Sequence, residues 1–368
     1  MICFYLIWCF GYFLALAWIS CYWPSKSSNI PLSPVQPARI SVVIPFRNES
    51  RLVSHLIPEL HKIRHRVHEI LLVDDQSEDD SFEKFNLAAE EVPNLKVLKS
   101  TGLGKKAALS KGILEAVGDI ILTSDADCKF PETWASEMIR QFENPSVQLV
   151  AGPVITEDSK RSLFNGFQQI EWASILLLTQ FFFEKGNPLM CSGANLAFRK
   201  SAFDQVHGYS GNEKFLSGDD EFLLKKIHQH FGPDSSRYLP IRNALVKTEP
   251  QQTWGALLNQ RVRWAGKWKL HRSFSHGLVA VFSFVAQLIW IGSVFFLLVG
   301  EISILAFLGI WLVKIVAEGI AFRKVLKSLK LSFSWPDLLA TSVIHPFYVL
   351  AVGIGTIQGK FNWKGRSN

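Results

Sequence analysis

The apolar residues of this chain are concentrated towards its two ends, and this uneven placement constrains the fold more than any single motif. Residues 1–23 carry no charged side chain and supply about the twenty apolar residues that a helix needs to cross a bilayer. A cleaved signal peptide is the alternative, but the segment has no basic start and no small-residue cleavage site. We therefore predict a transmembrane anchor. The first positive charges, Lys26 and Arg39, follow it and favour a cytoplasmic continuation.

Two more apolar runs lie near the other end of the chain, at residues 277–299 and 302–322. Only Gly300 and Glu301 separate them, and so short a connection predicts a helical hairpin. The basic stretch that follows, residues 323–330, should face the cytoplasm by the same charge rule. Both flanks of the central region are therefore expected on one side of the membrane.

A last apolar run, at about residues 337–357, contains His345 and Pro346. If this run crosses the bilayer, the basic tail at residues 358–368 lies outside, against the charge rule. A re-entrant or interfacial segment is the alternative, and the sequence does not decide between the two.

Two opposite charges, Lys314 and Glu318, lie one helical turn apart inside the run 302–322. The simpler interpretation is a pair whose charges neutralise each other within the bundle. The alternative is a polar lining for a substrate path. We favour the first interpretation.

The overall charge and the cysteine content limit the class of partner. A formal net charge of +7 favours an anionic partner such as nucleotide phosphates or acidic lipid headgroups. No zinc-knuckle spacing or recognition-helix pattern supports nucleic acid, so no nucleic-acid partner is expected. The five cysteines show no metal-ligand spacing, and their odd number argues against a disulfide framework.

The central region is mixed in composition, as in a soluble protein. Residues 24–38 are rich in proline and serine and are predicted to be a linker, and residues 39–273 could form one well-buried α/β domain. Short β-branched runs alternate there with helical stretches, which predicts a mainly parallel, doubly wound sheet. Ligands of such sheets bind beyond the carboxyl ends of the strands. The predicted strands are residues 40–44, 69–73, 95–98 and 119–123, and the predicted helices are residues 49–67, 79–91 and 104–117.

Acidic residues gather where these strands end. A single polar residue at such a position is commonplace as a helix cap, but four aspartates at two strand ends repel one another unless a cation binds. Mg²⁺ or Mn²⁺ at an Asp-x-Asp pair would keep several waters and take further ligands from a diphosphate. The candidate site residues at these strand ends, acidic and other, are Pro45, Arg47 and Glu49 after the first strand, Asp74 and Asp75 after the second, and Asp125 and Asp127 after the fourth.

The turn at residues 102–106 contains two glycines and two lysines, but it is not a Walker A loop. It lacks the first glycine of that motif, and Lys106 stands where serine or threonine should bind magnesium. The turn could still lead Lys105 towards the site. A solvated basic face is an equally open interpretation.

A second acidic cluster, formed by Asp219, Asp220 and Glu221, begins a helix predicted at residues 222–230. Capping accounts for one acid at a helix N-terminus, but three exceed that need. One of them could act as a general base towards an acceptor hydroxyl.

Gln260, Arg263 and Trp264 are spaced to share one face of a helix shortly before the apolar runs. An interfacial helix with snorkelling cations and aromatic anchors is the alternative, which composition alone does not reject. The cations and the tryptophan that suggest an interfacial helix are Arg261, Lys267, Trp268, Lys269 and Arg272.

Taken in order, these segments resemble the family 2 glycosyltransferases with a GT-A fold. Each segment is modest alone, but seven in the order of the family cover about residues 40–264. The resemblance implies an α/β GT-A domain with transmembrane α-helices at both ends, in an integral protein of the cell inner membrane whose catalytic domain is cytoplasmic. The segments are SVVIPFRNES, ILLVDDQSEDDS, GKKAALSKGI, ILTSDADC, CSGANLAFRKSAF, GDDEFLLKKI and QRVRW.

The resemblance also implies roles on the donor side. Asp74 or Asp75 would contact the nucleoside, and Lys105 would approach the donor phosphates. Asp125 and Asp127 form the Asp-x-Asp motif for Mg²⁺ or Mn²⁺, with Asp127 the better candidate for direct ligation. The other residues assigned to the donor side are Pro45, Arg47 and Glu49.

On the acceptor side, Asp220 aligns with the catalytic aspartate of the family, and Asp219 replaces the glutamate that precedes it. This departure leaves open which of the two acids acts. The residues matching acceptor-side and diphosphate-side motifs are Cys191, Gly193 and Asn195, and the Gln-x-x-Arg-Trp residues Gln260, Arg263 and Trp264.

The expected function is inverting transfer of a hexosyl or N-acetylhexosaminyl group from a nucleotide-sugar donor to a membrane lipid or lipid-linked acceptor. A processive polysaccharide synthase is the alternative, although so few membrane segments leave little room for a polymer pore. An alternative of another class is a non-catalytic glycan-binding or scaffold membrane protein, against which the retained acidic motifs argue. The sequence fixes neither the donor sugar nor the oligomeric state.

Overall fold

The structure is a computed structural model of the full chain. It describes residues 1–24, 39–156, 162–212, 218–266, 274–359, 362–363 and 366–367. Most of the predicted linker, Lys267, Trp268, Lys269 and Arg272, and most of the predicted basic tail therefore lie outside the described residues.

The chain divides into two compact units, each of which is described by itself. The sheet unit comprises Lys26–Glu157 and Phe182–Glu249, and the helical unit comprises Met1–Ser25, Asp158–Phe181 and Pro250–Asn368. The segment 39–273, predicted as one domain, is thus divided between the two units.

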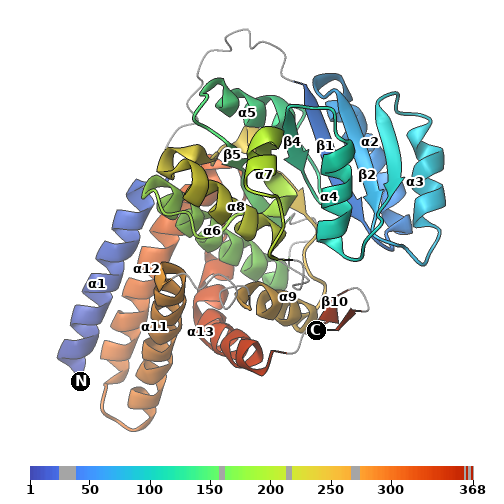
Figure 1. The fold of residues 1–368 in the computed structure, drawn as a ribbon. Coiled ribbons are helices and arrows are strands. Elements are labelled where there is room, and N and C mark those ends of the chain that lie inside the picture. The colour runs from blue at the N-terminus through green and yellow to red at the C-terminus, as the bar shows by residue number, and fades with distance from the viewer. Residues whose placement is uncertain are drawn as a thin grey trace. The chain divides into compact units, whose positions relative to one another are not determined.

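Seven of the described strands form the main sheet of the sheet unit, in the order β3-β2-β1-β4-β7-β5-β8. The neighbouring strands β2, β1 and β4 can be followed in Figure 1. All neighbours pair in parallel except β7, which is antiparallel to both β4 and β5. The predicted mainly parallel sheet is confirmed. The strands are β1 (Ile40–Phe46), β2 (Glu69–Asp74), β3 (Leu95–Lys99), β4 (Ile120–Thr123), β5 (Leu149–Ala151), β7 (Leu196–Arg199) and β8 (Ser236–Tyr238); β6 (Val154–Thr156) and β9 (Val246–Thr248) pair separately.

Helices cover both faces of this sheet. Helix α4 approaches one face so closely that Gly112 leaves no room for a side chain against Val43 and Val73. Phe46 lies an odd number of residues from Val43, so it points to the opposite face, where its ring packs on Phe85 of α3. The helices of this unit are α2 (Val53–Ile63), α3 (Ser81–Ala89), α4 (Lys105–Glu115), α5 (Trp134–Arg140), α7 (Lys200–Gln205) and α8 (Asp219–Phe231), with short 3₁₀ turns η1 (Ser50–Leu52), η2 (Arg64–Arg66), η3 (Gln141–Glu143), η4 (Gly193–Asn195), η5 (Pro233–Ser235) and η6 (Arg242–Ala244).

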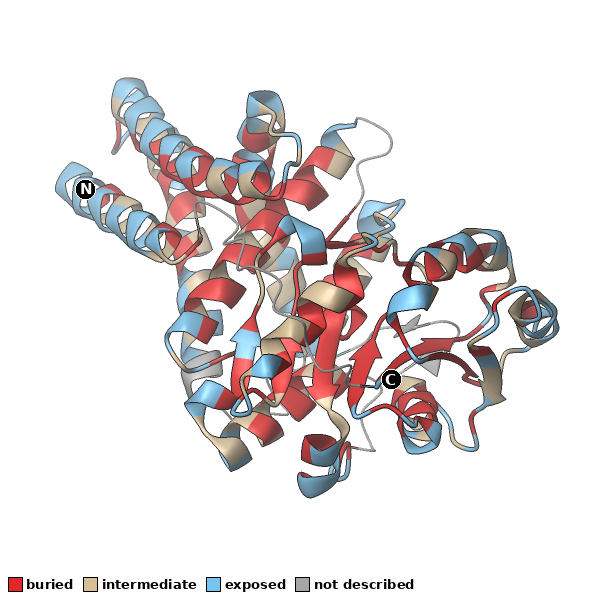
Figure 2. Cartoon of the chain, turned by 90° about the horizontal axis from the view of Figure 1, so that it is seen from above, coloured by how far each residue is buried: buried red, intermediate tan, exposed pale blue. Residues whose placement is uncertain are grey.

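The first strand is longer than predicted, because β1 continues through Pro45 to Phe46. Pairing with β4 ends at Val43, so the missing amide hydrogen of Pro45 costs no ladder bond on that side. All residues of β1 and β2 are buried (Figure 2). The predicted helix at residues 49–67 is α2 flanked by the turns η1 and η2.

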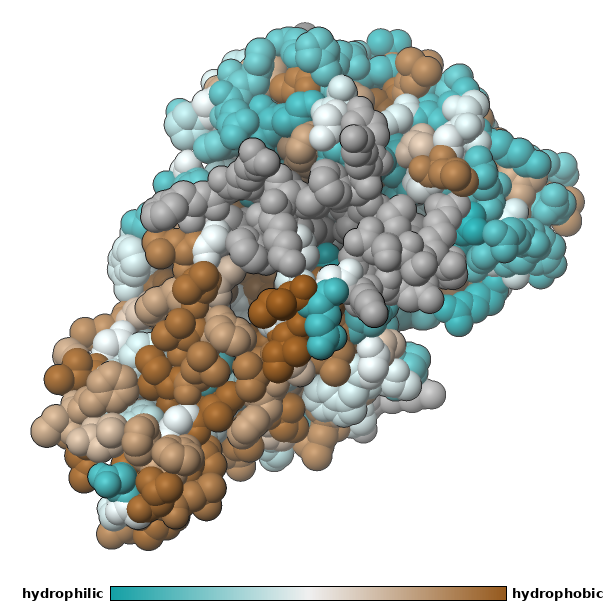
Figure 3. Space-filling view, turned by 60° about the horizontal axis from the view of Figure 1, so that its bottom comes forward, coloured by the Kyte–Doolittle hydropathy of each residue, from teal (hydrophilic) through white to brown (hydrophobic). Residues whose placement is uncertain are grey.

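Among the residues that the structure describes, four helices of the helical unit are long and apolar enough to cross a membrane. The surface of these helices is largely apolar (Figure 3). Among their large apolar side chains, Ile7 and Leu305 are 73% and 79% exposed. The last of the four is one continuous helix despite Pro346. The helices of this unit are α1 (Ile2–Cys21), α11 (Phe274–Leu298), α12 (Ile304–Ser328), α13 (Trp335–Gln358), α9 (Trp254–Ala265) and most of α6 (Leu163–Glu184), followed by a short pair of strands, β10 (Asn362–Trp363) and β11 (Arg366–Ser367).

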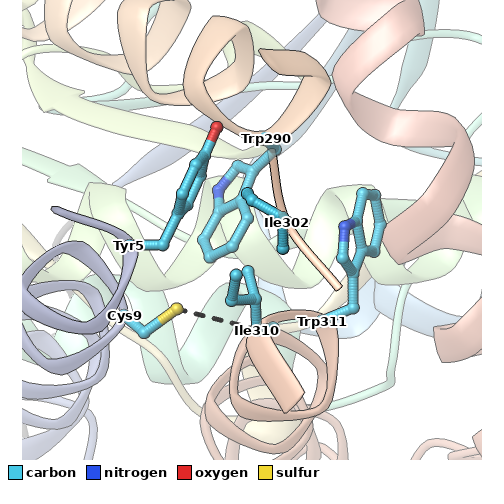
Figure 4. Close-up of a cluster of buried hydrophobic side chains, with 6 residues drawn as sticks. All are labelled: Tyr5, Cys9, Trp290, Ile302, Ile310 and Trp311. Atoms are coloured by element: carbon cyan, nitrogen blue, oxygen red, sulfur yellow. Dashed lines mark hydrogen bonds between the residues drawn. The ribbon is translucent and has the colours of Figure 1, made fainter. Parts of the chain in front are cut away.

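An aromatic cluster joins α1, α11 and α12 (Figure 4). Trp290 is fully buried there, and the thiol of Cys9 lies 3.8 Å from the carbonyl oxygen of Ile310. The Tyr5 hydroxyl donates a hydrogen bond to the carbonyl of Ile289. These contacts fill the space between the three helices with side chains.

Candidate active site

The carboxyl end of β4 is fastened to the segment that precedes β7. The Thr123 hydroxyl donates to the carbonyl of Gly193 over 2.8 Å, and the Ser124 hydroxyl donates to that of Ala194 over 2.7 Å. The predicted Asp-x-Asp pair follows β4 directly, so these bonds bring the predicted acceptor-side segment beside the predicted donor-side carboxylates.

Lys105 is the cation at the centre of the acidic cluster. It begins α4 after Gly104, whose φ of 91° suits glycine, and its ammonium lies 2.5 Å from Oδ1 of Asp125 and 3.9 Å from Oδ2 of Asp219. Burial alone would lower the pKa of Lys105, but the charges of Asp125, Asp219 and Asp220 outweigh it and raise the pKa. The Lys105 ammonium therefore lies among these carboxylates rather than on a solvated basic face.

Asp220 is the more accessible acid at the start of α8. Gly218, with φ at 91°, turns the chain into the helix, and Asp219 is buried while Asp220 is half-buried. The amide of Gly193 donates to Oδ2 of Asp220 over 3.1 Å, and the amide of Glu221 donates to Oδ1 over 2.8 Å. These two bonds orient the Asp220 carboxylate.

The Asp127 carboxylate accepts a hydrogen bond from Thr248, a residue that no sequence pattern singled out. The Thr248 hydroxyl donates to Oδ2 of Asp127 over 2.8 Å. Thr248 ends β9, a strand far along the chain, and no local pattern around it signals a role in the site.

The carboxylates fit a magnesium or manganese ion better than a zinc ion. Among the described residues, no three histidine, cysteine or acidic side chains are grouped to hold a metal. Mg²⁺ is commonly held by one or two carboxylates together with substrate phosphates, whereas structural zinc takes four protein ligands. Asp125 and Asp127 are both half-buried and supply such a pair.

The residues after β1 and β2 fasten the loops of the site to one another. The amide of Gly104 donates to Oδ1 of Asp75 over 2.6 Å, which fixes the turn before Lys105. The Arg47 guanidinium donates to the carbonyls of Asp75 and Gln76 and pairs with Glu78 at 2.7 Å. Pro45 and Glu49 are buried, and Asp74 Oδ1 accepts a bond from the amide of Ser77.

Asn195 lies in the core rather than on an accessible surface. Its amide donates to the carbonyls of Pro153 and Ala244 over 2.9 and 2.7 Å and accepts from the indole of Trp134 over 2.8 Å. All three bonds tie strands and loops together, so Asn195 supports the site without facing it. Cys191 is half-buried, and its neighbour Gly193 holds Asp220.

The Gln-x-x-Arg-Trp residues belong to the helical unit, on α9. Gln260, Arg263 and Trp264 are all half-buried, and Thr253 caps the helix by accepting from the amide of Ala256. Arg261, which the interfacial interpretation needed on the surface, is instead 5% exposed. That interpretation is therefore wrong for Arg261.

The parallel sheet with carboxylates beyond its strand ends is of the GT-A type, as predicted. Residues 41–206 match the family model described as "Glycosyl transferase family 2". A mannosyltransferase from Pyrobaculum calidifontis, solved in complex with GDP-Man and Mn²⁺, has a similar fold at a TM-score of 0.60 and 17% identity, over 97% of this chain and 98% of that one.

The curated proteins that resemble this chain are named as a glycosyltransferase and as a polysaccharide synthase. The chain is 26% identical over 237 residues to "Probable glycosyltransferase YdaM" of Bacillus subtilis, covering 62% of this chain and 54% of the relative. It is 27% identical to the poly-beta-1,6-N-acetyl-D-glucosamine synthase of Staphylococcus aureus, covering 61% and 53%. The chain spans about half the length of the curated relatives it matches.

Proposed function

We propose that this protein is a metal-dependent, inverting glycosyltransferase that uses a nucleotide-sugar donor. The observation that carries the proposal is the half-buried carboxylate of Asp220, which the amide of Gly193 orients beside the Lys105–Asp125 ion pair. A base and a cationic, metal-competent cluster within one site are what direct glycosyl transfer requires. The family match over residues 41–206 supports the same reaction class.

In this mechanism Asp220 removes the proton of the acceptor hydroxyl as that oxygen attacks the anomeric carbon from the face opposite the nucleotide. The attack from the opposite face inverts the anomeric configuration. Lys105 balances the charge of the acids, and Thr248 keeps the Asp127 carboxylate in one orientation. A Mg²⁺ or Mn²⁺ ion held by Asp125 and Asp127 would supply positive charge for the departing diphosphate.

We further propose that the four long apolar helices span a membrane and that the sheet unit faces the cytoplasm. Contacts of α1, and of Trp23 just after it, advance together along both helices: Cys9 meets Ile310, Tyr12 meets Glu318 and Trp23 meets Ser328 of α12. The two helices therefore run parallel, and their carboxyl ends lie at the same membrane face. This supports the charge-based orientation, in which both flanks of the central region lie inside.

The native cysteines at the two ends of α1 test this orientation. Cys3 and Cys21 are both exposed. An impermeant maleimide should label Cys3 on intact cells when Cys21 is replaced by serine, and should label Cys21 in the reciprocal variant only after permeabilisation. The reverse pattern of labelling would show that the sheet unit lies outside.

The proposed acceptor is a membrane lipid or lipid-linked sugar. In the described bundle, packed aromatic side chains fill the space between α1, α11 and α12, which supports a lipid acceptor over an internal polymer channel. The match to a poly-N-acetylglucosamine synthase favours the alternative, processive synthesis.

Membranes incubated with labelled nucleotide-sugars distinguish the two acceptors. We expect label in the lipid extract, of low molecular mass and sensitive to the donor offered. Label confined to insoluble polymer would replace the lipid acceptor with processive synthesis.

A further inference from the structure

Arg261 forms a buried, two-pronged ion pair with Glu171 of α6. Its Nε donates to Oε1 of Glu171 over 2.9 Å, and its Nη2 donates to Oε2 over 2.7 Å. Both side chains are only 6% exposed. A buried arginine of this kind needs a matched carboxylate, since an unpaired buried charge is strongly destabilising.

The same guanidinium contacts two of the three Gln-x-x-Arg-Trp side chains. Its central carbon lies 4.3 Å from the ring centre of Trp264, and its Nη1 donates to the amide oxygen of Gln260. Trp172, next to Glu171, contacts both groups. The centre of its ring lies 5.4 Å from the central carbon of the Arg261 guanidinium, and the ring packs edge-on against Trp264 at a distance of 5.4 Å between ring centres. A planar guanidinium can pair with a carboxylate and stack on an indole together, which an ammonium cannot do.

The beginning of α9 is fixed by other contacts. Thr253 caps the helix, and the fully buried Leu257 packs against Phe167 of α6 and Tyr348 of α13. The Arg261–Glu171 pair is therefore not required to dock the first turns of α9. The pair instead acts on the last turns of α9, which carry the Gln-x-x-Arg-Trp side chains.

We propose that Arg261 and Glu171 are positioning residues for glycosyl transfer, which together hold Gln260 and Trp264 in one arrangement. The proposal rests on the proposed function, because Gln260 and Trp264 have a role only if transfer occurs. Glu171 lies outside every motif that the sequence displays, and Arg261 occupies a position that the Gln-x-x-Arg-Trp pattern leaves open.

The test compares Glu171→Gln and Arg261→Lys with the wild-type full-length protein in detergent. Glu171→Gln removes the charge with little change of shape, and Arg261→Lys keeps the charge but loses the fork and the stacking. We expect both to lower kcat about tenfold or more while the donor KM stays within about twofold, as for loss of an interaction made in the transition state. Amide hydrogen exchange of residues 260–266 should rise about tenfold, with residues 254–258 unchanged.

Glu137→Gln is the matched control. Glu137 pairs with Arg140 at 3.1 Å in the sheet unit, with both side chains at most 14% exposed. This variant should lose an ion pair of similar burial without changing kcat or the exchange of α9. If Glu171→Gln misfolds, Arg261→Lys carries the test, because it retains the charge pair.

Two results would overturn the proposal. Full turnover by Arg261→Lys would show that charge balance suffices, and unchanged exchange of residues 260–266 in both variants would show that the pair orders nothing there. If the wild-type protein transfers no sugar from any donor, the proposed function fails instead, and the exchange comparison still decides whether the pair positions these side chains.

Discussion

The ammonium of Lys105 lies 2.5 Å from a carboxylate oxygen of Asp125, the first acid of the Asp-x-Asp pair. The side chain of Lys105 is 21% exposed, so this attraction is only partly screened by water. Among the described residues, Lys105 is a cation that offsets the charge of the surrounding aspartates. A divalent metal bound to Asp125 would compete with it directly.

Lys105→Met should make the protein more dependent on metal for its stability. Loss of the ammonium removes a positive charge from the acidic cluster, so the melting temperature without metal should fall, and Mn²⁺ should raise it by more than in the wild-type protein. Lys111→Met is the control, since Lys111 lies on the same helix and pairs with Glu115 at 2.7 Å. Equal responses to Mn²⁺ in both variants would contradict this account of Lys105.

Thr248→Val should weaken Mn²⁺ binding about 10-fold or more without unfolding the protein, as for loss of an outer partner of a metal ligand. Valine has nearly the shape of threonine but cannot donate to Asp127. Thr156→Val serves as control, because Thr156 pairs directly with Thr248 between β6 and β9. Titration calorimetry measures the affinity, and an unchanged affinity in Thr248→Val would show that its hydroxyl does not orient Asp127 for metal.

Glu69 should make the sheet unit sensitive to acid. Burial alone would raise its pKa, but bonds from Ser41 and the amide of Val117, with the charge of Lys96, outweigh burial and lower it. A lowered folded-state pKa stabilises the fold above the unfolded pKa, and this stabilisation is lost as the pH falls through the folded value. Glu69→Gln should therefore cost about 1–3 kcal/mol near neutral pH and much less in acid.

Chemical denaturation at several pH values measures this difference. The control is Glu115→Gln, where Glu115 is 47% exposed in a surface pair and its replacement should leave stability unchanged at any pH. A cost in Glu69→Gln that stays constant down to acid pH would contradict the role of its charge.

Lys314 and Glu318 should behave as a structural pair. The Lys314 ammonium donates to Glu318 over 2.6 Å and to the carbonyl of Ser342 over 3.1 Å, while Tyr12 donates to Glu318 over 2.8 Å. Lys314→Met and Glu318→Gln should each lower thermal stability in detergent, because each leaves a buried charge unpaired. The double variant should lose less than the sum of the single changes.

Sugar transfer by the double variant decides between the two interpretations of this pair. We expect transfer to persist in the double variant at a temperature where it remains folded. Loss of transfer under those conditions would instead support a polar substrate path.

Periodicity and strand ends predicted the first half of the sheet unit and the grouping of its acids. β-branched runs report burial in a parallel sheet, and the topology then brings successive strand ends together. Periodicity and strand ends do not predict which side chains from distant segments of the sequence contact each other. The partners of Asp127 and Arg261, Thr248 and Glu171, are 121 and 90 residues away in sequence. For this reason composition alone did not reject a surface position for Arg261.

The burial of Asn195 could not be predicted from the sequence for the same reason. Its partners come from the connection between β5 and β6, a helix and a 3₁₀ turn, and no local pattern distinguishes a polar residue in the core from one that faces a ligand.

The most direct test of the account is sugar transfer by purified wild-type protein and its Asp220→Asn variant, across UDP- and GDP-sugars with and without Mn²⁺. Wild-type protein should transfer one donor sugar with inversion in a metal-dependent manner. Asp220→Asn should lose transfer by about 100-fold or more, the contribution of a general base, while donor binding is largely retained. Near-normal turnover by Asp220→Asn would contradict the assignment of the base, and a wild-type protein that neither binds nor hydrolyses any nucleotide-sugar would contradict the proposed function itself.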